Sequence, residues 1–95
     1  MDEKRIKYAQ LLGRKGFYEI LHYIKNHEER VILSDLLPIA GHGTIMDRRE
    51  ELLEIGLISD GKIKEGRRNY IIYNLTPKGE KVLEKLDKVL DVMVK

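Results

Sequence analysis

The residues best suited to chemistry form a basic cluster in the second half of the chain. Between residues 61 and 68 lie four bases, Lys62, Lys64, Arg67 and Arg68. The one acid in this segment is Glu65, so the local charge is +3. A flexible, glycine-containing turn with this charge suits the phosphate backbone of duplex DNA or an adjacent minor groove. The alternative is a solvated turn whose charges keep an edge strand from pairing with other chains.

A second set of candidates lies near the start of a predicted helix over residues 44–56. We expect Arg48 to face away from the core and to bind guanine through its planar fork. The alternative for Arg48 is an ion pair with an acid of its own helix, Glu51 or Glu54. His42 and Thr44, at the helix start, are better placed for a phosphate. The candidate DNA-binding residues are His42, Thr44, Asp47, Arg48, Lys62, Lys64, Arg67 and Arg68.

Catalytic and metal-binding patterns are weak by comparison. The three histidines, His22, His27 and His42, form no HExxH pattern and have no acidic ligand at metal spacing. Ser34 and Ser59 have no histidine and acid partners in their sequence context, and the strand–turn–helix signal of a nucleophile is missing. We therefore predict a protein that is not an enzyme and that uses no cofactor and no metal.

The composition predicts one small cytoplasmic domain that spans residues 1–95. Hydrophobic residues make up 42% of the chain, enough for a small core that a partner subunit would help to cover. The net charge of +2 is too small to indicate nucleic acid, so any basic surface must come from local clustering. The chain has no cysteine, which suits an intracellular protein without disulfides. No stretch approaches the roughly 20 apolar residues that span a bilayer, and we expect no membrane partner.

The hydrophobic pattern of the first third predicts two helices and a short strand. Residues 3–13 have the modest apolar face of a helix. A cleaner amphipathic pattern starts at Phe17 and fades near Asn26. Residues 31–33 are apolar and partly β-branched, which suits a brief strand, and Ser34 is then expected to cap a short helix.

The next segment predicts two consecutive helices separated by a turn. Pro38 removes a backbone donor, so the first of these helices should be short or distorted. Residues 41–43 follow as a turn. Thr44, with Asp47 three residues later, has the spacing of a capping box and opens the second helix. That helix stops at Gly56, since glycine is the usual left-handed residue beyond a helix end.

The remaining sequence predicts a hairpin followed by a helix. A strand starts at Leu57, residues 64–68 form a charged loop, and residues 70–75 return with the two-residue alternation of a pleated strand. Thr76 precedes a proline and is expected to cap the last helix, over residues 77–95.

Two segments resemble parts of known regulators. Residues 44–58 (TIMDRREELLEIGLI) resemble the recognition helix and following strand of prokaryotic winged helix-turn-helix regulators. Residues 73–80 (YNLTPKGE) resemble the end of their wing and the start of the next helix. The likeness covers about residues 17–80 and is closest to small archaeal regulators and to the broad MarR, PadR and HxlR groups.

The resemblance implies an α+β, mostly α, winged helix-turn-helix fold with a β-hairpin wing. It places an extra N-terminal helix at residues 3–13, a core at 17–76 and a long C-terminal dimerisation helix at 77–95. It also implies a homodimeric, sequence-specific transcriptional regulator that binds double-stranded DNA. The helix over about residues 44–56 would enter the major groove, and the wing, residues 61–69, would follow the backbone.

Two features depart from the resembled pattern. Arg49 stands where such regulators usually have an aliphatic residue that faces the core, so either its stem lies over the core or the helix is rotated. The helix is also acidic, with four acids against two arginines. Acidic side chains near phosphates weaken binding. The alternative function is therefore a winged-helix module that binds another protein within a larger assembly.

An apolar stripe along the last helix predicts a dimer. Its spacing of 4, 3 and 4 residues suits a seam with the same helix of a second subunit, although it could instead cover the domain's own core. The first helix is a natural second contributor. The candidate interface residues are Ile6, Ala9, Leu12, Val82, Leu86, Val89, Leu90 and Met93. A third hypothesis is a small-molecule effector bound in a pocket at this interface.

Overall fold

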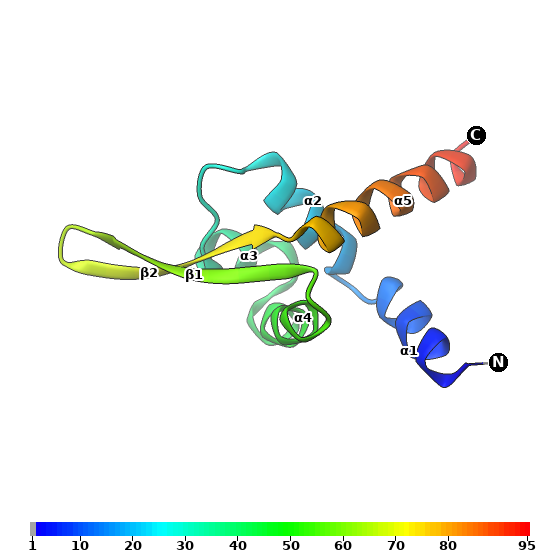
Figure 1. The fold of residues 1–95 in the computed structure, drawn as a ribbon, viewed down its shortest axis with the longest axis horizontal. Helices are drawn as coiled ribbons and strands as arrows, with labels where there is room; N and C mark the ends of the chain where they lie inside the picture. Colours follow the sequence, from blue (N-terminus) through cyan, green and yellow to red (C-terminus); the bar gives the residue numbers. More distant parts are fainter. Residues whose placement is uncertain (1) are drawn as a thin grey trace.

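Five helices and one β-hairpin make up the computed structural model, which describes residues 2–95 (Figure 1). In chain order the elements are α1 (Glu3–Leu12), α2 (Phe17–Asn26), α3 (Leu33–Ala40), α4 (His42–Ile55), β1 (Ile58–Glu65), β2 (Arg68–Leu75) and α5 (Pro77–Met93). The molecule measures 50 × 29 × 25 Å. The hairpin projects at one end of the long axis, and α1 and α5 diverge at the other (Figure 1).

Helix α2 forms the centre of the core. Its side chains at Phe17, Ile20, Leu21 and Ile24 are all buried, as the predicted i, i+3, i+4, i+7 spacing requires. Gly16 precedes the helix with a φ of +91°, and its amide donates to the Glu19 carboxylate at 3.1 Å. Helices α1, α3 and α5 and the strand β2 all pack against α2.

The start of α3 differs from the prediction. The helix begins at Leu33, and the Ile32 amide donates to the Asp35 carboxylate at 2.9 Å. Ser34, the predicted cap, lies exposed inside the helix. The prediction was wrong because the acid of the first turn supplies the capping contact from within the helix. Helix α3 continues through Pro38 but ends after eight residues, so it is short, as expected.

The turn between α3 and α4 is tighter than predicted. Gly41 alone makes it, with a φ of +84° that favours glycine. Helix α4 therefore begins at His42, and Gly43 lies inside it. The predicted turn over residues 41–43 and the predicted capping role of Thr44 were both wrong, because one glycine suffices to reverse the chain.

The hairpin is longer and more regular than predicted. Strands β1 and β2 pair antiparallel from Ile58 opposite Leu75 to Glu65 opposite Arg68. The predicted charged loop over residues 64–68 is reduced to a two-residue turn, because Gly66, with a φ of +62°, lets the strands continue to the tip. The predicted strand at residues 31–33 is a single bridge between Ile32 and Ile72.

The entry to α5 is held by several local contacts. The Thr76 hydroxyl accepts from the Gly79 amide at 2.9 Å, which confirms the predicted cap, and donates to the Gly56 carbonyl at 2.5 Å. Gly79 is buried against the backbone of Leu57, and a Cβ there would lie 1.9 Å from the Leu57 carbonyl oxygen. Leu83 completes this contact with the core. Beyond it, α5 leaves the body of the molecule (Figure 1).

Candidate nucleic-acid interface

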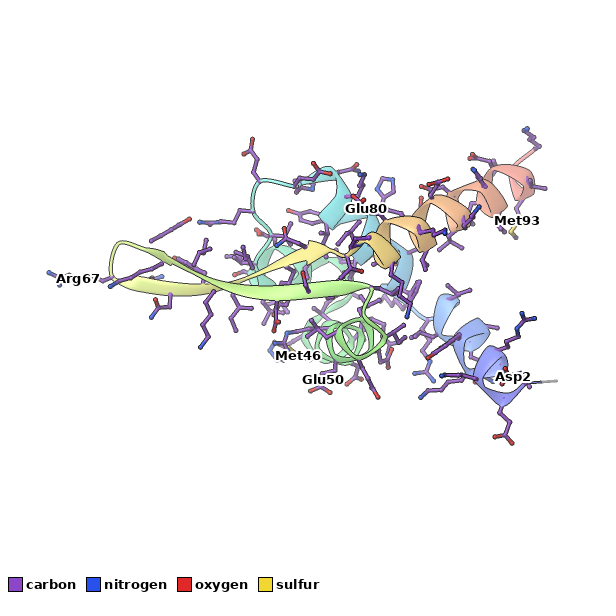
Figure 2. The ribbon with its side chains drawn as sticks, viewed as in Figure 1. Asp2, Met46, Glu50, Arg67, Glu80 and Met93 are labelled. Carbon is purple, nitrogen blue, oxygen red and sulfur yellow. The ribbon has the colours of Figure 1, made fainter. Side chains whose placement is uncertain are left out.

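Helix α4 presents an acidic face to solvent. Asp47, Glu50 and Glu54 are exposed and recur at spacings of three and four residues, so they lie on one side of the helix. In Figure 2, Glu50 and the neighbouring Met46 point away from the body of the molecule. The predicted site residues His42 and Thr44 lie in the first turn of this helix, His42 exposed and Thr44 half-buried.

Arg48 does not face solvent. Its side chain lies between Ile45 and Leu52 on the buried stripe of α4, and the residue is only 7% exposed. The predicted outward orientation was wrong because position 48 follows Ile45 by three residues and precedes Leu52 by four, which is the spacing of the core face. Its stem approaches Gly16, where a Cβ would lie 3.4 Å from Arg48 Cγ.

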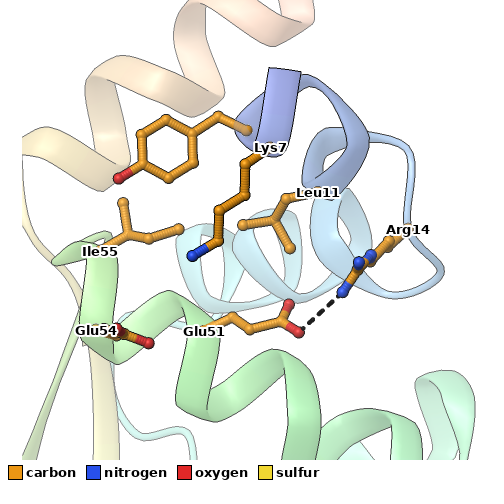
Figure 3. A pocket seen from close by; sticks show the side chains of 7 residues that line it. Lys7, Leu11, Arg14, Glu51, Glu54 and Ile55 are labelled. Carbon is orange, nitrogen blue, oxygen red and sulfur yellow. Dashed lines mark hydrogen bonds and ion pairs between the residues drawn. The ribbon is translucent and has the colours of Figure 1, made fainter. Parts of the chain in front are cut away.

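One carboxylate, that of Glu51, lies between two arginines. Arg48 Nη1 lies 3.3 Å from Glu51 Oε2. Arg14 Nη1 donates to Glu51 Oε1 at 3.3 Å, as Figure 3 shows. Among the described residues, Arg48 Nε and Nη1 and Glu51 Oε2 are buried without a well-aligned hydrogen bond. Arg14 lies in the turn between α1 and α2, so these contacts tie α4 to the base of α1.

Arg49 also points into the molecule. Its Nε donates to the hydroxyl of Tyr73 on β2, and its guanidinium carbon lies 5.5 Å from the centre of the Tyr73 ring. Tyr73 is 2% exposed, so this arginine supplies the polar partner that a buried phenol needs. Both basic residues of α4 are thus used inside the domain, which explains why its outer face is acidic.

The hairpin turns its lysines toward the same side of the molecule as α4. Lys62 and Lys64 are two residues apart on β1, so their side chains share one face of the hairpin. The residues opposite them on β2 lie on the same face, and so does Tyr73, two residues further along β2. Arg49 of α4 contacts Tyr73, so this face of the hairpin is turned toward α4. In Figure 1, α4 lies below the stem of the hairpin, where β1 begins, and the tip extends beyond it. The bases Lys62, Lys64, Arg67 and Arg68 are all exposed, and Figure 2 shows Arg67 at the far tip.

Comparison with solved structures identifies the fold. A transcriptional regulator of the MarR family from Porphyromonas gingivalis W83 superposes with a TM-score of 0.75 at 23% identity, covering 100% of this chain and 95% of that one. A PadR-like transcription factor from Bacteroides fragilis superposes with a TM-score of 0.70 at 22% identity, covering 94% and 91%. The chain has the winged helix-turn-helix fold. No family model matches its sequence, and no curated protein is significantly similar to it in sequence.

In the terms used for this fold, α3 and α4 are the helix-turn-helix, α4 is called the recognition helix for its position in the chain, and the hairpin β1–β2 is called the wing. The fold predicted from the sequence, mostly α with an added N-terminal helix and a β-hairpin wing, is confirmed. Seven of the eight predicted DNA-binding residues are exposed or half-exposed on the recognition helix and the wing. Among these seven, Arg68 lies opposite Glu65 in the register and therefore on the face away from Lys62 and Lys64. The eighth, Arg48, lies beneath the recognition helix.

The back face of the wing, away from its lysines, carries an ion pair that the sequence did not reveal. Arg30, in the loop between α2 and α3, donates to both carboxylate oxygens of Glu65. The same guanidinium lies 5.2 Å from the centre of the Tyr70 ring. The hydrogen bonds to Glu65 raise the pKa of Arg30. The acid that reduces the charge of the wing is therefore neutralised by a residue 35 positions earlier, for which a local sequence pattern gives no signal.

The two helices at the other end expose apolar surface. Ile6 and Leu12 of α1 and Val89 and Met93 of α5 are exposed, Val89 to 54% and Met93 to 72%. The other predicted interface residues are Ala9, which is exposed, and Val82, Leu86 and Leu90, which are half-buried. An apolar groove of about 370 Å³ runs along α5, with Leu12, Val82, Leu86 and Val89 in its lining.

Two further features bear on function. Within residues 2–95, no three His, Asp or Glu side chains come together to hold a metal ion. No helix in the same range is long and apolar enough to cross a membrane.

Proposed function

We propose that this protein is a homodimeric, sequence-specific DNA-binding regulator. The observation that supports this most is the common side shared by the recognition helix and the wing lysines Lys62 and Lys64. A helix in the major groove and a wing on the flanking backbone require both elements to face one duplex. The two solved structures of the same fold are described as transcription regulators, which agrees with this function.

The wing supplies most of the affinity in this proposal. Lys62 and Lys64, on the side of α4, and Arg67, at the tip, make no ion pair with a described residue, and Glu65 is paired with Arg30. Each phosphate that they neutralise releases a counterion and adds to binding in a salt-dependent way. The acidic face of α4 repels phosphates and cannot supply this energy itself.

The recognition helix supplies selectivity through acceptors and apolar atoms. Asp47 and Glu50 can accept a hydrogen bond from the amino group of cytosine, and Met46 can contact the methyl group of thymine. His42 and Thr44, in the first turn, suit a phosphate or a base edge. Arg48 makes no contact with DNA in this proposal, because its side chain is buried between the helix and the core and cannot reach the groove.

Dimerisation places two such surfaces on one operator. The exposed apolar side chains of α1 and α5 lie at the opposite end of the molecule from the wing, so two copies can join there without covering it (Figure 1). A two-fold pair of recognition helices would contact half-sites separated by about 34 Å, one turn of DNA. A protein of this kind works in the cytoplasm of a prokaryotic cell, with the DNA that it regulates.

The test is fluorescence anisotropy of a labelled random duplex, titrated with protein at several salt concentrations. We expect binding that weakens steeply with salt. The double variant Lys62→Ala, Lys64→Ala, on the face that the wing shares with α4, should bind more weakly and flatten the slope by about 0.9 per lost phosphate contact. Lys88→Ala with Lys95→Ala removes the same charge at the far end of α5 and should leave the slope unchanged.

A second candidate function rests on the acidic face of α4. Three exposed carboxylates, those of Asp47, Glu50 and Glu54, would suit a basic surface of another protein better than a phosphate backbone. Absence of DNA binding even at low salt would overturn the first proposal and favour this one. Retention of DNA binding by the variant Asp47→Ala, with loss of preference for a selected operator, would instead support a role for α4 in base recognition.

A further inference from the structure

The wing is held to the body of the domain at two levels. At its stem, the Tyr73 amide donates to the Val31 carbonyl at 2.9 Å, and Ile72 forms the bridge to Ile32. Nearer the tip, the wing extends away from the helices (Figure 1). Of the described hydrogen bonds, ion pairs and cation–π contacts between residues 62–70 and the rest of the chain, all involve Arg30.

Arg30 contacts the wing on its back face. Glu65 pairs with Arg68, and Tyr70 pairs with Ile63, so Glu65 and Tyr70 lie on the face opposite to Lys62 and Lys64. The guanidinium of Arg30 thus approaches from the side that faces away from α4. A duplex lying across α4 and the wing lysines would leave this contact in place.

We propose that Arg30 is a positioning residue that braces the wing through Glu65 and Tyr70, so that the wing lysines meet DNA at a fixed angle to α4. This inference rests on the proposed function and adds to it a residue outside the DNA-facing surface. Arg30 acts on binding by ordering the wing before DNA arrives, which removes that ordering cost from association.

The geometry of these contacts favours a role for Arg30 in ordering the wing more than in stabilising the whole domain. An exposed ion pair between flexible side chains adds little to the stability of a fold. One guanidinium nitrogen, Nη1 of Arg30, donates to both oxygens of the Glu65 carboxylate while the guanidinium lies over the Tyr70 ring, and these two contacts together fix the direction of the side chain. Loss of the brace should therefore loosen the outer wing while the melting temperature of the domain stays nearly unchanged.

The substitution Glu65→Gln distinguishes bracing of the wing from a simple charge effect, because the two predict opposite changes in the affinity for DNA. It removes a negative charge from a basic wing, so charge alone predicts tighter binding to DNA. The brace predicts the opposite, because the neutral amide holds Arg30 less firmly. The matched control is Asp60→Asn, which removes one negative charge from the lysine face of the same hairpin, where Asp60 makes no ion pair with a described residue.

Two measurements test the proposal on the whole chain of residues 1–95. The first is backbone ¹⁵N relaxation of the free protein, in which residues 62–70 should have order parameters near 0.85 in the wild type and near 0.6 in Glu65→Gln. The second is anisotropy with a random duplex at fixed salt, in which Glu65→Gln should bind roughly three- to tenfold more weakly. Asp60→Asn should keep wild-type order and bind as tightly as the wild type or more tightly.

The charge swap Arg30→Glu with Glu65→Arg provides the rescue. It keeps the net charge and restores an ion pair between the same positions, so order and affinity should recover relative to Arg30→Glu alone. Equal or tighter binding by Glu65→Gln, with an ordered wing, would overturn the proposal. If the wild type itself does not bind DNA, the proposed function fails. In that case the order parameters alone decide whether Arg30 braces the wing.

Discussion

Arg48 lies under α4 with the Glu51 carboxylate as its neighbouring charge among the described residues. Taking a guanidinium out of water is costly, and a facing carboxylate offsets that cost only while the pair remains intact. Glu51 also binds Arg14, so a single carboxylate stabilises a buried cation and a surface cation together. This makes Glu51 more important to stability than its half-exposed position suggests.

Replacing Glu51 by glutamine should therefore destabilise the fold strongly. The variant keeps the shape of the side chain but leaves Arg48 buried without a counter-charge, so the free energy of unfolding should fall by about 3 kcal/mol. Urea denaturation measures this change. Glu50→Gln, on the exposed face of the same helix, should change it by less than about 0.5 kcal/mol.

A second variant distinguishes a broken pair from a damaged helix. Arg48→Met keeps much of the volume of the stem and removes the buried charge, so it should be tolerated far better than Glu51→Gln. Equal stability of Glu51→Gln and the wild type would mean that water, not Glu51, compensates Arg48.

The two arginines of α4 mark the limit of sequence reasoning at this scale. The assumption that arginines lie on the surface predicts an exposed Arg48, although the spacing of this residue from Ile45 and Leu52 matches the buried stripe of α4. Arg49 stands out in the sequence as an unusual residue at its position. Its partner, Tyr73, lies 24 residues away, so only the folded structure shows that the two are in contact. Side chains whose partners are distant in sequence cannot be assigned from local periodicity.

At the scale of elements, the joint between α5 and the wing depends on a glycine. Gly79 lets the first turn of α5 touch the backbone of Leu57, just before β1. The sequence predicted the cap at Thr76 because its signal is local. The need for glycine at position 79 is a matter of close approach between elements, which the sequence does not reveal.

Replacing Gly79 by alanine should test this joint. The new methyl group would overlap the Leu57 carbonyl, so the free energy of unfolding should fall by about 3 kcal/mol despite the better helix propensity of alanine. Gly43→Ala is the matched control, since α4 leaves open space around that position. It should stabilise the protein by up to about 1 kcal/mol, as measured by thermal and urea denaturation. A stabilised Gly79→Ala variant would contradict the packing described.

A hydrogen bond between α2 and α5 should make stability depend on alkaline pH. The Tyr18 hydroxyl donates to the Asp87 carboxylate at 2.7 Å, and this bond raises the pKa of Tyr18 above its ordinary value of 10.0. Because the folded state favours the protonated phenol, the contribution is fully present below pH 10 and is lost as the pH rises through the pKa of the folded state. Tyr18→Phe should therefore show a shallower loss of stability between pH 9 and 11, roughly the range in which tyrosine ionises.

Urea titrations of both proteins across that range measure the difference. Equal slopes for the wild type and Tyr18→Phe would show that the bond between Tyr18 and Asp87 contributes nothing to the dependence.

The order and type of the elements were predictable because their periodicities are strong, except for the expected strand at residues 31–33, which is a single bridge. Errors occurred at residues 41–43 and 64–68, where one positive-φ glycine turned the chain in fewer residues than the composition suggested.

At the scale of the whole molecule, the hairpin and the apolar surfaces of α1 and α5 lie at opposite ends (Figure 1). Val89 and Met93 extend the stripe of Val82 and Leu86 beyond the core, where the chain itself leaves them uncovered. Solvent-exposed apolar stripes of this kind mark sites of association.

Introducing charge into this stripe should dissociate the proposed dimer. Val89→Glu with Met93→Glu would bury carboxylates in the seam, so sedimentation velocity should show a monomer. Lys88→Glu with Lys95→Glu adds as many carboxylates outside the apolar stripe, since Lys88 lies on another face of α5 and Lys95 lies beyond its end, and should leave the dimer intact. A wild-type monomer at micromolar concentration would contradict the interface, and a dimer that survives Val89→Glu with Met93→Glu would place it elsewhere.

The overall architecture was predictable from two short motifs, but the direction in which α5 leaves the body was not. That direction depends on the close contact at Gly79 and on the Tyr18–Asp87 bond, both of which join residues far apart in the chain. The same holds for the angle of the wing, which depends on contacts from the loop after α2.

The inward orientation of Arg48 and Arg49 has a consequence for how such a protein can diverge. The side chains that hold α4 in place are separate from those on its outer face. Under the proposed function, substitutions at Met46, Asp47 or Glu50 would therefore alter operator preference while folding and general affinity are preserved. After a gene duplication, two copies could acquire different targets through a few surface changes, and the same few positions offer a short route to reprogramming the protein in the laboratory.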